Sequence, residues 1–296
     1  MLGPGNNGET SIPAIDLALA AAVAIAGLIA VLSSRRGGRF RELPGWAGFW
    51  VVLAAVLVAL SRLPPWASFP LLALVMFAAL RTFFFIAPVR SRDRYAILAA
   101  YMVIPFSLWP AYLGSRDMFL AMVPVTLFLL IPVFLAGSDE DGLLDSMGRT
   151  LLGVLLFVFC LAHLGLLVHQ QPRGVLELFG VLVLAAELPQ RLAGRYRRGK
   201  GWLRPTSGLA LSFLMTVGLG WWLGPWCGLG DDDAARAGIL VCVAVTLGAL
   251  VSAAVARDLE LHRPASRMGR GALLNRMVPA IYAAPVYFHY LNFFAP

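Results

Sequence analysis

Long apolar runs alternate with short polar segments along nearly the whole chain. A helix needs about 20 mostly apolar residues to cross the hydrocarbon core of a bilayer, and ten runs approach that length. They lie at residues 12–32, 46–60, 66–87, 95–113, 118–136, 147–168, 175–193, 207–226, 234–256 and 277–294. The pattern predicts an all-α, polytopic transmembrane protein with about ten spans. Because the second run is short and the seventh ends on Glu187 and Gln190, nine spans is the alternative count.

The composition agrees with lipid as the surrounding solvent. Of 296 residues, 59% are hydrophobic and 14% are charged, and the mean hydropathy is +0.78. A water-soluble domain does not need this many apolar residues to bury one core. The spans and their short connections also leave no room for a soluble domain. We therefore predict one membrane domain over residues 1–296, with an N-terminal helical part at 1–180.

Basic residues concentrate in alternate loops. Most of the 24 lysines and arginines lie in four segments, Arg35–Arg41, Arg90–Arg94, Arg191–Arg204 and Arg257–Arg276. The intervening loops each hold one arginine: Arg62, Arg116, Arg173 and Arg236. Short cytoplasmic loops accumulate Lys and Arg, so with ten spans the four basic segments are cytoplasmic and both termini are non-cytoplasmic. The expected location is a bacterial inner membrane, as a multi-pass protein.

The positive charge points to an anionic partner at the membrane. The net charge is +8, but no soluble segment is available to form a groove for nucleic acid, so we exclude that partner. A phospholipid head group or another phosphate is the expected ligand of the basic loops. The alternative is that these charges serve orientation alone.

Few residues suggest catalytic chemistry. Cys160, Cys227 and Cys242 lack the spacing of a metal site, and the four histidines lie on different segments. His163 and Glu187 fall inside predicted spans, where ionisable groups are costly and are therefore candidates for function. A neutral, hydrogen-bonded His163 and a Glu187 that reaches the interface are the structural alternatives.

Residues 181–296 resemble the phosphatidate cytidylyltransferases, also called CDP-diacylglycerol synthases. That family carries DTxAYxxGRxxGK, then GDLxESxxKR, then KD, then GHGGxxDRxDS before a final span. The corresponding segments are ELPQRLAGRYRRGK from Glu187, GALVSAAVAR from Gly248 and GRGALLNRMVP from Gly269. Earlier, ALRTFF from Ala79 is similar to the family's ALxEFF. The resemblance implies a cytidylyltransferase-like C-terminal part at 181–296 and a homodimer.

The basic and glycine positions of the motifs match the family, whereas the acidic positions do not. Cations expected to bind phosphate or lipid are Arg195, Lys200, Arg257, Arg270 and Arg276. The family's acidic, serine, lysine or histidine motif positions are occupied by Ala249, Ser252, Ala253, Ala256, His262, Arg263, Arg270, Asn275 and Val278. In the family, carboxylates hold the divalent metal for transfer from CTP to phosphatidate, so this chain is expected to lack that metal site.

The resemblance therefore implies a degenerate member of the family, a pseudoenzyme that binds a phospholipid head group or a phospholipid-enzyme partner without catalysis or a cofactor. The first alternative is an active phosphatidate cytidylyltransferase in which Asp258 and Glu260 hold Mg²⁺ in a rearranged site. Whether the chain is an enzyme is left open between these two. The second alternative is a lipid or solute transporter, suggested by the number of spans and by the prolines within them.

Overall fold

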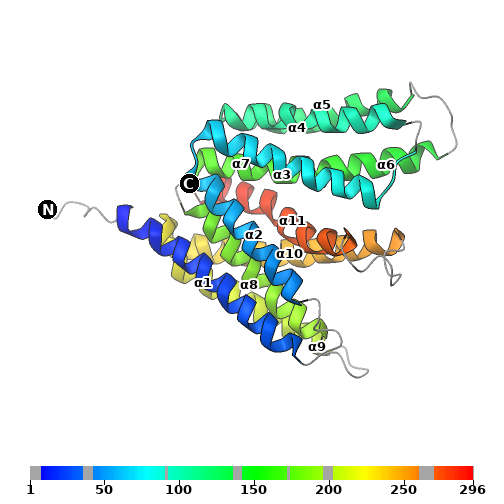
Figure 1. Ribbon diagram of the computed structural model, residues 1–296. Helices are drawn as coiled ribbons and strands as arrows, with labels where there is room; N and C mark the ends of the chain where they lie inside the picture. Colours follow the sequence, from blue (N-terminus) through cyan, green and yellow to red (C-terminus); the bar gives the residue numbers. More distant parts are fainter. Residues whose placement is uncertain are drawn as a thin grey trace. The chain divides into compact units, whose positions relative to one another are not determined.

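The computed structural model describes residues 8–35, 43–90, 93–135, 142–171, 174–195, 203–259 and 270–295. These residues are helical and include no β-strand, which confirms the all-α prediction (Figure 1). The α-helices are α1 Gly8–Ser34, α2 Leu43–Arg62, α3 Pro65–Ile86, α4 Arg94–Tyr112, α5 Arg116–Leu135, α6 Leu143–Val154, α7 Leu161–Gln170, α8 Val175–Arg195, α9 Leu203–Leu223, α10 Asp231–Asp258 and α11 Arg270–Phe294.

Eight helical segments within the described residues are long and apolar enough to cross a membrane. One of them, Leu143–Gln170, joins α6 and α7 through a π-helical turn at Leu155–Cys160. The other two predicted runs are also helical, as α8 and α11. They fall outside this group because α8 carries four charged residues and α11 is rich in tyrosine and proline. The chain is thus a polytopic helical membrane protein.

The second helix is longer than its apolar run suggested. The run at 46–60 is short, but α2 covers Leu43–Arg62, a full 20 residues. Pro44 lies in its first turn, where the missing N–H of proline costs no helical hydrogen bond. Ser61 and Arg62 extend the last turn with polar side chains. This helix therefore has the length of an ordinary span.

Two compact units make up the chain, and each is assembled from separate segments. The first unit contains Met1–Arg62, Gln171–Gly248 and Val286–Pro296. The second unit contains Leu63–Gln170 and Ala249–Pro285. The predicted boundary between residues 180 and 181 falls inside α8, in the first unit.

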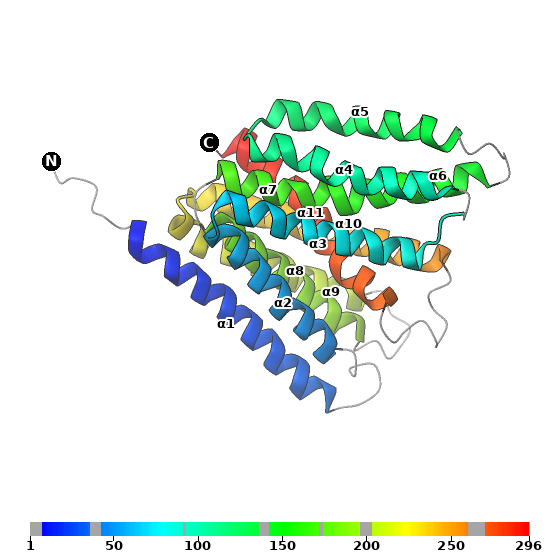
Figure 2. The ribbon, with the colours of Figure 1, turned by 45° about the horizontal axis from the view of Figure 1, so that its top comes forward.

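Helix α8 is the buried element of the first unit. It contacts α1, α2 and α9, and α1 and α2 run along it in both ribbon views (Figures 1 and 2). A side chain at Gly180 would lie 2.8 Å from the side chain of Leu57, so glycine lets α2 pack closely. On the α9 side, the Ser212 hydroxyl donates to the Ala186 carbonyl across 2.7 Å. Polar groups placed on α8 are consequently held away from lipid.

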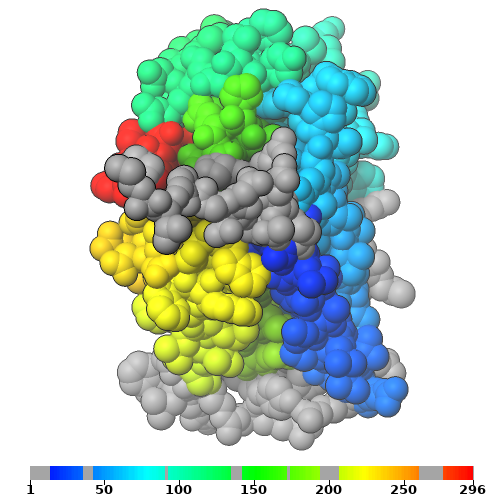
Figure 3. Space-filling view, turned by 90° about the vertical axis from the view of Figure 1, so that its left-hand side faces the viewer, coloured from blue at the N-terminus to red at the C-terminus, as the bar shows by residue number. Residues whose placement is uncertain are grey.

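Small residues bring α9 and the first half of α10 into backbone contact. A Cβ added to Gly220 would lie 2.4 Å from the carbonyl oxygen of Ala234, and one added to Gly238 would lie 2.4 Å from that of Thr216. In the space-filling view the two helices form a continuous yellow surface (Figure 3). Such small-residue contacts are how membrane helices associate, because lipid offers no hydrophobic driving force between them.

A buried carboxylate lies at the start of α4 in the second unit. Asp93 is 4% exposed and accepts a hydrogen bond from Arg90 Nε at 2.8 Å. It also accepts a hydrogen bond from the hydroxyl of Ser146, in the first turn of α6. Burial raises the pKa of Asp93, but the hydrogen bonds from Arg90 and Ser146 and the charge of Arg90 outweigh it, so the pKa is lowered. This carboxylate ties the α3–α4 connection to α6.

Replacing Asp93 with asparagine is expected to lower the free energy of unfolding in mild detergent by about 1 kcal/mol at neutral pH. A lowered folded-state pKa means that the carboxylate stabilises the fold above its ordinary value of 3.8 and ceases to do so as the pH falls through the folded value. The difference between the wild type and Asp93→Asn should therefore stay constant above about pH 5 and shrink below pH 3.8. A difference that grows on acidification would contradict this assignment.

Candidate functional site

Two glutamates lie on α8 inside the first unit. Glu177 is 0% exposed and Glu187 is 2% exposed. Ten residues of helix separate them, which is about 15 Å along the axis. A carboxylate away from water is costly unless other groups bind it. The hydrogen-bond and ion-pair partners of each carboxylate therefore indicate whether its role is structural or functional.

Glu187 is held by two tryptophans of α2. The indole N–H groups of Trp46 and Trp50 donate to Glu187 Oε2, at 2.8 Å and 3.3 Å. The two indoles can converge on one oxygen because residues four apart share a face of a helix. Both tryptophans are almost fully buried, so each indole N–H needs a partner inside the protein. The carboxylate supplies both partners and ties α8 to α2.

Arg191 completes the cluster one turn further along α8. Its Nε donates to the same Oε2 at 3.0 Å, and its guanidinium carbon lies 5.5 Å from the centre of the Trp46 ring. The pair is formally neutral, and the aromatic face adds a favourable cation–π contact. These contacts offset the cost of burying the charge of Glu187 and give its Oε2 atom a structural role.

The second oxygen of Glu187 is different. Oε1 is buried and receives no hydrogen bond from the described residues. A buried carboxylate oxygen retains its capacity to accept a proton donor or to ligate a cation. The site thus combines an oxygen held by three donors with a buried oxygen that has no donor among the described residues. Glu187 was the candidate predicted within this span, and it also begins the stretch that resembles the family's middle motif.

The tryptophan partners were not predicted from the sequence. A usable signal existed, because Trp46 and Trp50 are one turn apart in an otherwise apolar span and each carries a donor that lipid cannot satisfy. The Glu187 side chain is buried and bonded to α2, so within the protein it is shielded from the surface.

A second polar cluster lies around Glu177, at the start of α8. Glu177 Oε1 accepts a hydrogen bond from the Ser61 hydroxyl of α2, while Oε2 is buried and receives none from the described residues. Nearby, Arg62 of α2 pairs with Asp16 of α1. Of these residues only Arg62 had been noted in the sequence, as a loop arginine, and the cluster itself was not predicted. They show that α2 engages both glutamates of α8.

Comparison with known proteins adds a relative that spans almost the full chain. The protein named "Uncharacterized protein YnbB" from Escherichia coli (strain K12) is 26% identical over 284 residues, covering 88% of this chain and 90% of that protein. No family model matches the chain. No solved structure matches it either. The name of the relative states no activity, so a functional proposal has to rest on the residues of this chain.

The structure describes two of the five predicted phosphate-binding side chains. Arg257 is exposed in the last turn of α10, and Arg276 is partly buried on α11. Both belong to the second unit. The backbone places Arg195 at the end of α8 and Arg270 at the start of α11, but their side chains lie outside the described set, as does all of Lys200. The five cations are therefore not assembled into one described site.

The degenerate motif positions lie mainly on α10 and α11. Ala249, Ser252, Ala253 and Ala256 belong to α10, and the Ser252 hydroxyl bonds to the Ala249 carbonyl at 3.0 Å. Val278 is buried on α11. His262 and Arg263 lie outside the described residues, as does the side chain of Asn275. The described part of this segment has no carboxylate before Asp258, the last residue of α10.

The remaining candidates, one histidine and three cysteines, are buried or partly buried among the helices. His163 follows the π-helical turn, and its Nδ1 is 2.7 Å from the Phe159 carbonyl oxygen. Its ring packs edge-on against Phe119 with centroids 4.9 Å apart. Cys227 and Cys242 are buried, and Cys160 is partly buried. No group of three metal-ligating side chains occurs among the residues that the structure describes.

Proposed function

We propose that the protein is a multi-pass component of a bacterial inner membrane that binds the phosphorylated head group of a phospholipid without transferring a nucleotide. The site lies at the arginine-rich ends of α10 and α11, with Arg257 and Arg276 as its described members. Arg270 belongs to this site through the resemblance to phosphatidate cytidylyltransferases, which also predicts phosphate binding by Arg195 and Lys200 in the first unit. A phospholipid-synthesising enzyme and a second copy of the chain are the proposed protein partners.

The composition of the last turns of α10 supports this proposal most strongly. Between Gly248 and Arg257 the helix offers alanine and serine where the family has carboxylates. The single hydroxyl there, on Ser252, is engaged by its own helix. Arg257 is exposed immediately beyond. Arginine binds phosphate through paired charge-assisted hydrogen bonds and needs no metal to do so, whereas cytidylyl transfer needs carboxylate-bound metal.

The test compares Arg257 with an arginine in the opposite set of loops. Replacing Arg257 with glutamine is expected to weaken binding of short-chain phosphatidate to the purified protein by about tenfold, since one charge-assisted hydrogen bond contributes about 1.5–3 kcal/mol. Arg257→Lys should recover part of the affinity, because lysine keeps the charge but cannot make the two parallel hydrogen bonds of a guanidinium. Arg236→Gln, on the N-terminal turns of α10, is the matched control. Equal losses from Arg257→Gln and Arg236→Gln would contradict the site.

The same preparation separates binding from catalysis. With phosphatidate, CTP and Mg²⁺, the non-catalytic proposal expects no release of pyrophosphate. Release that is abolished by Asp258→Asn would instead establish the active cytidylyltransferase with a rearranged metal site. Asp258 is exposed at the end of α10, and Glu260 lies outside the described residues.

A transport function is the second candidate, favoured by the carboxylates of α8. Glu177 and Glu187 each present a buried oxygen that receives no hydrogen bond from the described residues. Buried carboxylates in membrane helices commonly mark proton or ion pathways. Proteoliposomes with an imposed proton gradient test this candidate. Glu187→Gln should abolish any flux that depends on this carboxylate while retaining the fold.

A further inference from the structure

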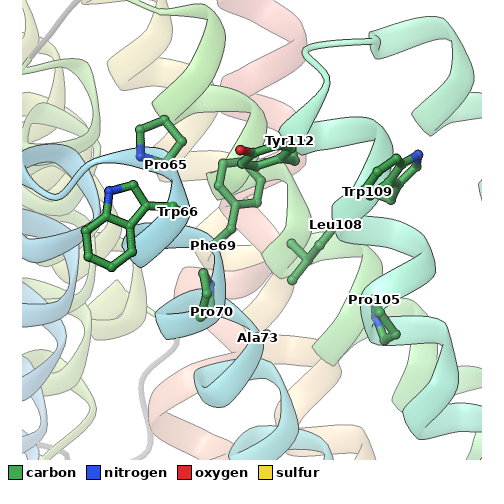
Figure 4. Close-up of a pocket in the computed structure, with 9 residues that line it drawn as sticks. All are labelled: Pro65, Trp66, Phe69, Pro70, Ala73, Pro105, Leu108, Trp109 and Tyr112. Atoms are coloured by element: carbon green, nitrogen blue, oxygen red, sulfur yellow. The ribbon is translucent and has the colours of Figure 1, made fainter.

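An apolar hollow opens between α3 and α4 in the second unit. Its volume is about 360 Å³, and nine residues line it. Figure 4 shows Phe69 of α3 next to Tyr112 of α4 in the middle of the view, with the rings of Trp66 and Trp109 at its left and right. The volume lies within the range of small-molecule sites, and the lining is overwhelmingly hydrocarbon. The hollow involves none of the arginines of the proposed head-group site.

One end of the hollow lies where α3 begins and α4 ends. Trp66 is the second residue of α3, and Tyr112 is the last residue of α4. Trp66 is 73% exposed and Trp109 is 58% exposed. Exposed tryptophan and tyrosine at helix ends mark the boundary between head groups and hydrocarbon. From Trp66 to Ala73 the helix descends about 10 Å, so the hollow runs from this boundary into the hydrocarbon region.

Prolines and an aromatic pair shape the hollow. Pro70 in α3 and Pro105 in α4 both line it, and each removes a helical hydrogen bond and displaces the preceding turn. The rings of Phe69 and Tyr112 meet edge to face, with centroids 5.3 Å apart, and hold the two helices together beside the gap (Figure 4). Ala73 is too small to fill the space below. The hollow is thus built from rigid helices rather than from a loop.

We propose that this hollow binds one acyl chain of a phospholipid, with the head group at the level of Trp66 and Tyr112. A polar ligand would lose its hydrogen bonds against such a lining, whereas a hydrocarbon chain gains contact along its length. Arg116, the first residue of α5, follows Tyr112 by four residues and adds a positive charge at this end of the helices.

A second copy of the chain is a poorer occupant than lipid. Nine residues line the hollow, whereas a stable protein interface engages about 20–30 residues on each side. One acyl chain needs only a small contact area and therefore suits an open hollow lined by nine residues of two helices. The lipid would occupy the membrane leaflet opposite the Arg90–Arg94 connection, since the hollow lies at the other ends of α3 and α4. It is therefore a lipid site distinct from the proposed head-group site.

Photo-crosslinking tests this proposal directly. The full-length protein would carry p-benzoylphenylalanine in place of Trp109, which lines the hollow, or, as a control, in place of Phe106. Phe106 is an exposed aromatic residue of the same helix outside the hollow. After reconstitution into vesicles of phosphatidylcholine and phosphatidylglycerol, the protein is extracted and washed in detergent before illumination. Mass spectrometry should find a phospholipid adduct at position 109 and none at position 106, because lipid on the open surface is washed away. A protein dimer adduct at 109, or equal adducts at both positions, would overturn the proposal.

A filling substitution provides a second readout. Ala73→Phe should abolish the phospholipid that stays with the washed protein through this hollow, while Ala78→Phe leaves it unchanged. The melting temperature of both variants in detergent shows whether the fold is intact. If intact Ala73→Phe protein retains the same amount of phospholipid as the wild type, the hollow does not hold lipid.

Discussion

Replacing Glu187 with alanine is expected to lower the free energy of unfolding by about 3 kcal/mol, because it removes the acceptor shared by two buried indole N–H groups and by the partly buried Arg191. Arg191 would lose the carboxylate that it contacts at 3.0 Å. The indoles of Trp46 and Trp50 would lose the oxygen that both now share. Reversible unfolding of the purified protein in mixed micelles, followed by tryptophan fluorescence, measures the effect.

Two further variants separate charge from hydrogen bonding at this site. Glu187→Gln keeps an acceptor for the indoles and should be less destabilising than Glu187→Ala. The double variant Glu187→Leu and Arg191→Leu removes both charges and should recover part of the lost stability, since an apolar pair can replace an ion pair but gives the two indole N–H groups no acceptor. If Glu187→Ala unfolds like the wild type, the cluster does not stabilise the fold, and the carboxylate serves a ligand instead.

A second large effect is expected where α9 and α10 meet. Gly220→Ala should destabilise the protein by about 2 kcal/mol, because the added methyl group overpacks a contact between two backbones. Its Cβ would lie 2.4 Å from the carbonyl oxygen of Ala234, an atom that cannot rotate away. The helices would have to separate. Thermal unfolding in detergent, measured by circular dichroism, reports the loss.

The same helix provides a matched control two residues earlier. An added Cβ on Gly218 meets nothing within 4 Å, so Gly218→Ala should leave the melting temperature unchanged or raise it slightly through better helix propensity. Gly238→Ala, on the facing side of the contact, should behave like Gly220→Ala because its Cβ meets the Thr216 carbonyl oxygen. Equal melting temperatures for the Gly218 and Gly220 variants would show that the two helices are free to separate.

The candidate site shows how far sequence reasoning reaches in a membrane protein. Glu187 could be selected from the sequence alone, because an acidic residue in an apolar run requires an explanation. Its partners could not be selected. Trp46 lies 141 residues away from Glu187 in the sequence, and no pattern within α2 indicates which helix packs against it. The Ser61 contact with Glu177 was missed for the same reason.

The sequence by itself determined that this chain is a helical membrane protein and set the order of its helices. In lipid every backbone N–H and C=O must be satisfied within its own segment, so an apolar run of sufficient length becomes a helix whatever surrounds it. Only the tertiary structure decided that α8 is enclosed, that α2 holds its glutamates, and that α3 and α4 leave a hollow between them. Lipid and neighbouring helices are equally apolar, so the choice of partners depends on small residues and buried polar groups rather than on hydropathy.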